Sequence, residues 1–302
     1  MAYDKNTIYF SIPDFYNLFQ LNMNLLRLMD EYKEWFRDNV KVDSMYGTFP
    51  GVIWNSGRGQ FGQAPLENIA QTIAAINKVG VSIRYTFTNS LITGRHFKDY
   101  YGNIILELSN SNMGYGVTNG VNCSSELFAD YVEQNYPNLY LMWSTTKGVR
   151  TVEEIDKLSA TRLTVPPYTM NNTNAVEKFA HPENIELLCC EACIDNCPNR
   201  STHYEDISKG QLLQPSKGFK CPHGCELYYY HDIVPTRKHH ITIDSMIEDY
   251  LPLGINKFKI SGRNDQVINV IERYVEYLPK PEYKDQVRNH LLIDFFNNQP
   301  IH

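Results

Sequence analysis

Eight short runs rich in apolar, β-branched or aromatic residues recur along the chain, separated by amphipathic segments. Such runs are typical of buried β-strands. They are "TIYFSI" (7–12), "GVIWN" (51–55), "VSIRYTFT" (81–88), "MGYGVT" (113–118), "LYLMWS" (139–144), "RLTVPP" (162–167), "IELLCC" (185–190) and "KFKIS" (257–261). Strands that alternate with helices predict a parallel sheet covered by helices. We therefore expect an α/β fold, a TIM-type (β/α)₈ barrel, with a doubly wound open sheet as the alternative.

The segments between these runs carry helical patterns. Residues 14–37 form a long amphipathic stretch, with Asp14 as the expected N-cap. Apolar residues recur on one face in 66–78, and "TVEEIDKL" (151–158) opens with a threonine followed by acidic residues. A regular apolar stripe at helical spacing runs through 267–278.

The organisation of the chain favours a single domain. Its 302 residues suit one large domain or two ordinary ones, and no Pro-, Gly- or Ser-rich linker divides them. We expect a barrel domain over residues 1–280, with a cysteine-rich loop at 189–225 and a polar C-terminal tail at 281–302.

Composition narrows the classes of protein. The net charge of −6 argues against general nucleic-acid binding. No apolar run approaches the roughly 20 residues that a membrane span needs. The opening "MAYDKNTIYFSIPDF" lacks the basic, apolar and small-residue regions of a signal peptide. These features predict a cytoplasmic protein without a membrane span.

Six of the seven cysteines fall within residues 189–225. Cytoplasmic thiols stay reduced, so a disulfide framework is not expected. Cys193 and Cys197 have the spacing C-x₃-C, and Cys221 and Cys225 repeat it. Four thiolates suit a tetrahedral zinc ion or an iron–sulfur cluster. Both pairs are one residue longer than the C-x₂-C pairs of many structural zinc sites, which favours a [4Fe–4S] cluster, with zinc as the alternative.

Cys189 and Cys190 are alternate ligands to this metal site. Adjacent residues of a strand point to opposite faces, so at most one of the two is expected to bind the metal. A third interpretation is that the clustered cysteines are buried, unreactive thiols. Cys123, which lies far from the cluster, is expected to be a thiol of this kind.

Polar residues follow several of the expected strands. In a barrel the active site lies at the carboxyl ends of the strands and in the loops after them. The candidate substrate-binding residues are Asn55, Arg58, Asn89, Asn119 and Arg263. The two arginines could pair with a carboxylate or a phosphate. We expect these side chains to surround the same cavity as the cysteines.

Three stretches of the chain resemble one known family. "CCEACIDNCPNRSTHY" (189–204), "GINKFKISGRND" (254–265) and "QVINVIERYVEYL" (266–278) look like the collagenase-like peptidase family of unassigned catalytic type. The resemblance implies a barrel-type core and, in several branches, a [4Fe–4S] cluster held by four cysteines. It also implies oxygen-independent hydroxylation of ubiquinone precursors or of RNA bases.

The chain departs from the family pattern in three ways. The paired-cysteine peptidase signature is missing, Ser261 replaces the usual Glu before "GR", and the extra C-terminal domain of longer members is lacking. We therefore expect an iron–sulfur redox enzyme with a small aromatic or nucleobase-type substrate and, in addition, a protein partner subunit. A peptidase-like hydrolase and a non-catalytic barrel with a structural zinc are the alternatives. No catalytic residue is assigned.

Overall fold

The fold is built on one parallel β-sheet that curls through eight strands. The structure, a computed structural model, describes residues 3–111, 114–223 and 228–297. Within these residues the strand order is β6-β5-β4-β3-β2-β1-β8-β7, and neighbouring strands are parallel. The strands are β1 (Ile8–Pro13), β2 (Val40–Gly47), β3 (Ser82–Phe87), β4 (Gly120–Cys123), β5 (Tyr140–Trp143), β6 (Leu163–Thr164), β7 (Leu187–Leu188) and β8 (Lys257–Lys259). This consecutive order differs from that of a doubly wound sheet, where the strand order reverses.

The two outermost strands of the sheet approach each other. An isolated parallel bridge pairs Thr164, at the end of β6, with Ile185, which precedes β7. The N–H group of Glu186 also donates to the carbonyl oxygen of Thr164 at 3.0 Å. The predicted α/β class is therefore confirmed in the form of a strongly curled parallel sheet.

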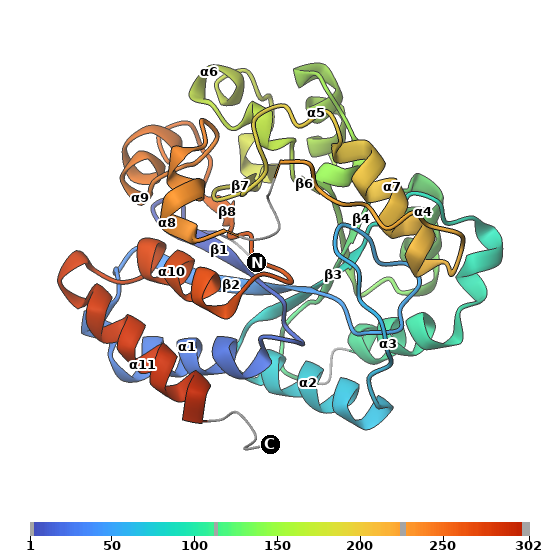
Figure 1. The fold of residues 1–302 in the computed structure, drawn as a ribbon, viewed down its shortest axis with the longest axis horizontal. Coiled ribbons are helices and arrows are strands. Elements are labelled where there is room, and N and C mark those ends of the chain that lie inside the picture. The colour runs from blue at the N-terminus through green and yellow to red at the C-terminus, as the bar shows by residue number, and fades with distance from the viewer. Residues whose placement is uncertain (1–2, 112–113, 224–227, 298–302) are drawn as a thin grey trace.

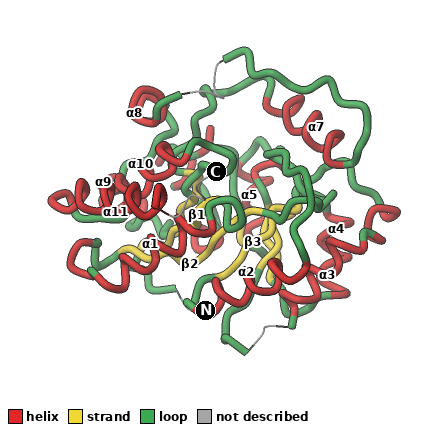
Figure 2. The backbone as a smooth tube through the Cα atoms, turned by 60° about the horizontal axis from the view of Figure 1, so that its bottom comes forward, coloured by secondary structure: helices red, strands yellow, loops and turns green. Residues whose placement is uncertain are grey.

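Helices cover the outside of the sheet. The longer helices are α1 (Phe19–Glu31), α2 (Leu66–Lys78), α3 (Tyr100–Asn110), α4 (Glu126–Asn135), α5 (Val152–Ser159), α7 (Arg200–Gln211), α10 (Val267–Tyr277) and α11 (Lys284–Asn297). The shorter helices are α6 (Thr173–Val176), α8 (Tyr230–Ile233) and α9 (Ile243–Ser245). Figure 1 shows the strands at the centre with the helices arranged around them. In Figure 2, α7 and α8 lie with long loops on one side of the sheet, away from α1, α2 and α3.

The two faces of the sheet have different chemistry. On the outer face, Phe10 of β1 and Phe258 of β8 are fully buried, and their ring centroids lie 6.3 Å apart. Phe10 also contacts Tyr277 of α10 at 5.4 Å between ring centroids. On the inner face, the buried guanidinium of Arg84 is paired with the carboxylate of Glu186. The buried charge of Arg84 is thus compensated by a carboxylate, as burial requires.

One predicted strand was misplaced in the N-terminal part. Residues 51–55 belong to the loop between β2 and α2, and the second strand is Val40–Gly47. Asp43 lies in this strand and pairs with Arg84 on the inner face at 3.0 Å. Strand β2 therefore lacks the continuous apolar run by which the strands were predicted, and the apolar run at 51–55 was taken for a strand in its place.

The fourth predicted strand was also misplaced. Residues 114–118, the described part of the run at 113–118, contain no strand, and β4 begins at Gly120. This glycine is needed where β4 meets β5, because a Cβ atom there would lie 2.3 Å from Cζ of Tyr140.

The helix predictions were more accurate. Helix α2 matches the predicted range 66–78, and α10 occupies most of 267–278. Thr151 caps α5 in a capping box with Glu154. Helix α1 begins only at Phe19. Asp14 lies before it at a φ of 58°, where its carboxylate accepts the N–H of Asn17 at 3.1 Å.

The C-terminal segment contains a helix. Helix α11 lies within the segment 281–302, and its residues Val287 and Leu291 are fully buried. On the same helix, Asp294 pairs with Arg27 of α1 at 2.8 Å. The helix therefore completes the layer that α1 and α10 form over the sheet.

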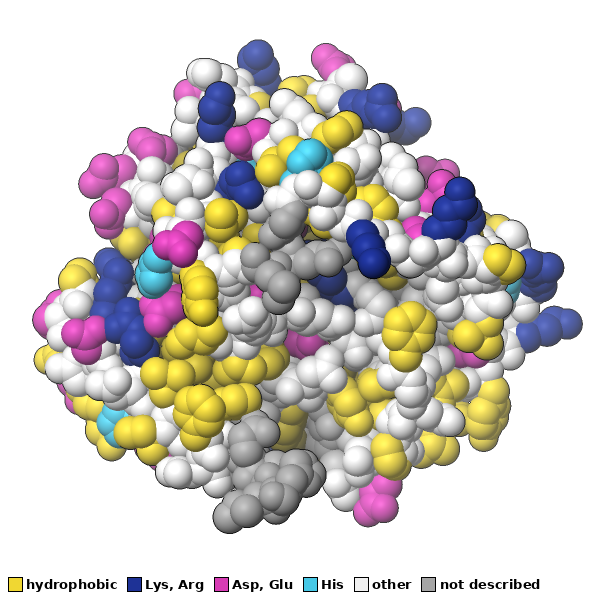
Figure 3. Space-filling model, viewed as in Figure 1, with side chains coloured by type: hydrophobic (Ala, Val, Ile, Leu, Met, Phe, Trp, Pro, Cys, Tyr) yellow, Lys and Arg dark blue, Asp and Glu magenta, His cyan; other side chains and the backbone are white. Residues whose placement is uncertain are grey.

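The surface carries charges of both signs. On the face drawn in Figure 3, Lys and Arg side chains are interspersed with Asp and Glu and do not gather into one basic patch. Within the described part of the chain, no helix combines the length and the apolar character that crossing a bilayer requires.

Candidate functional site

A cavity of about 250 Å³ lies at the carboxyl ends of β7 and β8. Cys193, Cys197 and Cys221 line it, and we call it the cysteine cavity. Its walls come from the loop after β7, from α7 and the segment after it, and from the loop after β8. Active sites of parallel α/β barrels lie at this end of the strands.

The loop after β7 positions Cys193 and Cys197. His239 fixes this loop at two points. Its Nδ1 lies 2.7 Å from Oδ1 of Asp195, and its Nε2 lies 3.1 Å from the carbonyl oxygen of Glu191. A loop held in this way presents both thiols to one cavity.

The segment that contains Cys221 folds back against α7. Asp206 of α7 accepts the backbone N–H groups of Lys217 at 3.0 Å and of Phe219 at 2.7 Å. The ring of Phe219 stacks on His203, with centroids 4.5 Å apart. These contacts bring Cys221 from a separate stretch of sequence to the cysteine cavity.

Positive charge exceeds negative charge in the described lining of this cavity. Four arginines and two carboxylates line it, which leaves an excess of two positive charges (4 − 2). These residues are Arg58, Arg200, Arg263, Arg273, Glu191 and Asp265. Burial lowers the pKa of Arg58, but Glu191, Tyr204 and Cys193 outweigh burial and raise that pKa. An excess of guanidinium groups suits a negatively charged group bound in this cavity.

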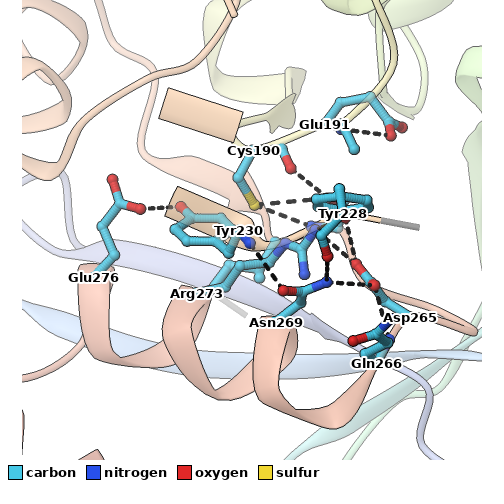
Figure 4. Close-up of polar contacts among 12 residues, drawn as sticks. Cys190, Glu191, Tyr228, Tyr230, Asp265, Gln266, Asn269, Arg273 and Glu276 are labelled. Atoms are coloured by element: carbon cyan, nitrogen blue, oxygen red, sulfur yellow. Dashed lines mark hydrogen bonds and ion pairs between the residues drawn. The ribbon is translucent and has the colours of Figure 1, made fainter. Parts of the chain in front are cut away.

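Arg273 of α10 connects this cavity to the sheet. Its Nη2 lies 2.8 Å from Oδ2 of Asp265 and donates to the hydroxyl group of Tyr228. Figure 4 shows the guanidinium between these residues and Cys190. Its buried Nε and Nη1 have no hydrogen-bond partner among the described residues. Buried donors of this kind are costly unless an acceptor completes them.

The two alternate ligands, Cys189 and Cys190, are fully buried and do not belong to the lining of the cysteine cavity. Sγ of Cys189 donates to the carbonyl oxygen of Lys259 at 3.4 Å. Sγ of Cys190 accepts the N–H of Ser261 at 3.3 Å. Burial raises the pKa of Cys190, but Cys189, Arg273 and Ser261 together lower it below its ordinary value.

Cys225, the fourth expected ligand, lies outside the described residues. Among the residues that the structure describes, no three His, Cys, Asp or Glu side chains come together as a metal-ion site. Cys123 is fully buried at the end of β4, where burial raises its pKa to about 12. Cys193, Cys197 and Cys221 nevertheless face one common space.

Three of the predicted substrate-binding residues form one network. Arg58 and Arg263 line the cysteine cavity. Asn55 lies behind them, where its Oδ1 accepts Nη1 of Arg263 at 2.9 Å and its Nδ2 donates to the carbonyl oxygen of Arg58 at 2.7 Å. Asn55 therefore positions both arginines without lining the cavity itself.

The other two predicted residues lie elsewhere. Asn89 donates to the carbonyl oxygens of Ile53 and Ser208, both at 3.1 Å, and so attaches α7 to the loop after β2. Asn119 precedes β4 and exchanges hydrogen bonds with Asn77 at 2.9 Å. Asn119 therefore lies at the amino end of its strand, and its predicted place beside the cysteines was wrong because β4 starts after it.

A second cavity of about 90 Å³ adjoins the cysteine cavity. We call it the mouth cavity because it lies over the inner face of the sheet, at the ends of the strands. The two cavities share Arg58, Glu191, Arg200 and Arg263 in their linings. Burial would raise the pKa of Glu191, but Arg200 and Arg58 outweigh it and keep that pKa below its ordinary value.

Glu191, Arg200 and Lys259 line these cavities but were not predicted from the sequence. Glu191 directly follows Cys189 and Cys190 at the end of the predicted strand 185–190. A carboxylate at the carboxyl end of a barrel strand is a candidate site residue, so the sequence could have identified Glu191. Arg200 is the first residue of α7, whose amphipathic pattern is weak. Its guanidinium lies over the ring of Tyr168 at 4.5 Å, a contact between segments that only the fold brings together.

The comparisons with known proteins concern mainly the fold. No protein-family model matches the chain, and no curated protein matches it. A solved structure described as that of the U32 peptidase Mk0906 matches with a TM-score of 0.51 and 13% sequence identity. The match covers 88% of this chain and 97% of that one. At this level of identity the likeness shows that the chain shares its fold with a U32 peptidase.

Proposed function

We propose that the chain is a cytoplasmic redox enzyme that holds a [4Fe–4S] cluster in the cysteine cavity. The proposed ligands are Cys193, Cys197 and Cys221, with Cys225 as the fourth. The proposed reaction is an oxygen-independent hydroxylation, or a related step, on a small aromatic or nucleobase-type substrate, with a co-substrate other than dioxygen that supplies the oxygen atom and accepts the two electrons. The observation that carries the proposal is that three cysteines from two separate segments line one cavity with an excess of positive charge.

The residues of the cavity fit a negatively charged group. Four thiolate ligands bring negative charge into a partly buried space, and nearby cations compensate such charge. The guanidinium groups of Arg58 and Arg200 provide positive charge near Cys193. Cys193 in turn contributes to the raised pKa of both arginines. Arg273 adds two buried nitrogens without a partner among the described residues. These donors suit the sulfur acceptors of a bound cluster.

The surrounding residues have separate roles in this proposal. When bound, an iron–sulfur cluster supplies one-electron transfer. Arg263 is fixed by Asn55 and by the carbonyl oxygen of Ser56, at 2.9 and 2.6 Å, and so offers a rigid positive charge to a substrate. Glu191 stays ionised between the two cavities and can accept a hydrogen bond from that substrate.

We also infer that the curled sheet closes into a (β/α)₈ barrel. The parallel bridge between Thr164 and Ile185 supports this inference, because it joins the two edges of the sheet. An experimental structure with a continuous ring of strands would establish the barrel.

The metal proposal is tested by metal content. The parent protein and the variants Cys193→Ser and Cys197→Ser are purified without oxygen, with Cys123→Ser as the buried-thiol control. We expect iron, sulfide and broad visible absorption in the parent and in the control. Both cavity variants should lose them while keeping the circular dichroism of the parent.

Other outcomes favour the alternatives. One zinc per chain without visible absorption would support a structural zinc site. A parent without metal would refute the metal centre, and activity on peptides that survives metal removal would support the peptidase-like hydrolase.

A further inference from the structure

The mouth cavity contains a buried amino group. Lys259 of β8 lines this cavity and is 7% exposed. Its Nζ lies 3.7 Å from the centre of the Tyr46 ring. Among the described residues, no hydrogen-bond acceptor and no carboxylate pairs with this nitrogen. Buried ammonium groups in folded proteins are normally paired, so Lys259 differs from the usual arrangement.

The other lysine of the same strand shows the usual arrangement. Lys257 points to the same face of the sheet at the opposite end of β8. Its Nζ donates to the carbonyl oxygen of Glu183 at 2.6 Å and to Oδ1 of Asn256 at 3.3 Å. Lys257 therefore has hydrogen-bond acceptors from the protein itself, whereas among the described residues the Nζ of Lys259 has only the ring of Tyr46.

Charged groups face Lys259 from several strands. Burial is the largest effect and lowers the pKa of Lys259 to about 8. Glu186 before β7 and Glu191 after it oppose this shift. Arg84 of β3 and Arg263 after β8 add to it. Both carboxylates lie beyond ion-pairing distance of Nζ, and at neutral pH the amino group remains mostly charged.

Further polar atoms of the mouth cavity are unsatisfied. Asn122 of β4 lines the cavity, is 3% exposed, and its Oδ1 has no hydrogen-bond partner among the described residues. Thr145 also lines the cavity, and its buried Oγ1 has no hydrogen-bond partner among the described residues. Lys259, Asn122 and Thr145 therefore line the same small space. A cationic side chain without an ion-pair partner in such a space suits a ligand that offers a negative charge.

We propose that the mouth cavity binds the carboxylate group of a small organic acid, with Lys259 as its counter-ion. The cavity of about 90 Å³ suits a carboxylate head group and little more. Whole drug-sized ligands need pockets of roughly 300 Å³ or more. Because the mouth cavity adjoins the cysteine cavity, the remainder of such an acid would extend toward Arg58 and Glu191. The carboxylate site does not depend on a bound metal.

The test is a binding titration with benzoate, measured by calorimetry at pH 7. Benzamide serves as the uncharged isostere and inorganic phosphate as the other oxyanion. We expect benzoate to bind and benzamide not to bind detectably. Lys259→Met should weaken benzoate binding about tenfold or more, as expected for loss of a charge-assisted contact. The matched control Lys257→Met, on the same strand, should bind benzoate like the parent.

The pH dependence gives a second measurement that needs no folded Met variant. The pKa of Lys259 is about 8, so its charge is present below pH 8 and is lost above it. Benzoate affinity of the parent should therefore fall by about tenfold between pH 7 and pH 9, following the fraction of ammonium. In Lys259→Arg the charge persists, and the affinity should stay constant over this range.

Several results would overturn the assignment. These are equal binding by Lys259→Met and the parent, equal binding of benzamide and benzoate, or a flat pH profile in the parent. Binding of phosphate without binding of benzoate would exclude a carboxylate site. Metal content is measured in the same samples, so the failure of this proposal is separable from the failure of the metal centre.

Discussion

Replacing Arg84 by Met tests the polar network on the inner face of the sheet. Arg84 is 1% exposed, and its guanidinium pairs with Glu186 and, at 3.0 Å, with Asp43. Its Nε donates to the hydroxyl group of Tyr140 at 2.7 Å. The residue therefore connects β3 to β2, to β5 and to the segment that begins β7.

The expected loss follows from what remains after the substitution. Met has a similar length, so little packing volume is lost. Glu186 is 1% exposed and would be left as a buried carboxylate without a cation, and its Oε1 already lacks a partner among the described residues. Removing one member of a buried ion pair typically destabilises a protein by about 3–5 kcal/mol. We expect Arg84→Met to reduce the free energy of unfolding by this amount at pH 7.

Urea denaturation followed by circular dichroism measures the effect. Adding Glu186→Gln to Arg84→Met should recover a large part of the loss, because the uncompensated charge is then removed. Arg162→Met is the matched surface control. Its partner Glu133 is 63% exposed, and such pairs contribute roughly 0–1 kcal/mol. A loss for Arg84→Met no larger than that of the control, or no recovery in the double variant, would refute the reasoning.

Two further predictions concern packing and pH. Gly120→Ala should lower the free energy of unfolding by about 1–3 kcal/mol in urea denaturation, because its Cβ would lie 2.3 Å from Cζ of the half-buried Tyr140 ring. Gly94→Ala, where no atom lies within 4 Å, should change it little, and equal effects of the two would contradict the steric argument. Burial raises the pKa of Glu276 to about 8, so the folded state binds a proton that the unfolded chain releases near its ordinary pKa. Stability should therefore fall as the pH rises toward 8, and Glu276→Gln should flatten this part of the thermal-unfolding profile, whereas parallel profiles would contradict the assignment.

The sequence predicts the alternation of strands and helices, and it fails where polar residues lie inside the sheet. The strand Val40–Gly47 was missed because Asp43 and Ser44 interrupt its apolar pattern. The apolar run at 51–55 was taken for a strand instead. It is a loop in which Gly51 has a φ of 92° and Trp54 packs outward against Phe128 at 4.9 Å.

The cysteines illustrate which part of a site the sequence can predict. Clustering and spacing identified Cys193, Cys197 and Cys221, and the structure places all three at one cavity. Spacing could not predict that α7 and the loop after it return Cys221 to that cavity. The return depends on contacts of Asp206 with Phe219 and its neighbours, which a linear pattern does not contain.

Lys259 was missed for a reason that the geometry of the fold explains. In "KFKIS" a strand was predicted from Phe258 and Ile260, which fill the apolar outer face against the helices. The same alternation requires Lys257 and Lys259 to point inward, where side chains in a curled parallel sheet meet each other instead of water. Lys257, near the amino end of β8, donates hydrogen bonds from its Nζ to protein acceptors. Lys259, near the carboxyl end of the same strand, has no such acceptor among the described residues. The inward register at the carboxyl end of β8 is therefore the sequence feature that would have singled out Lys259 as a candidate residue.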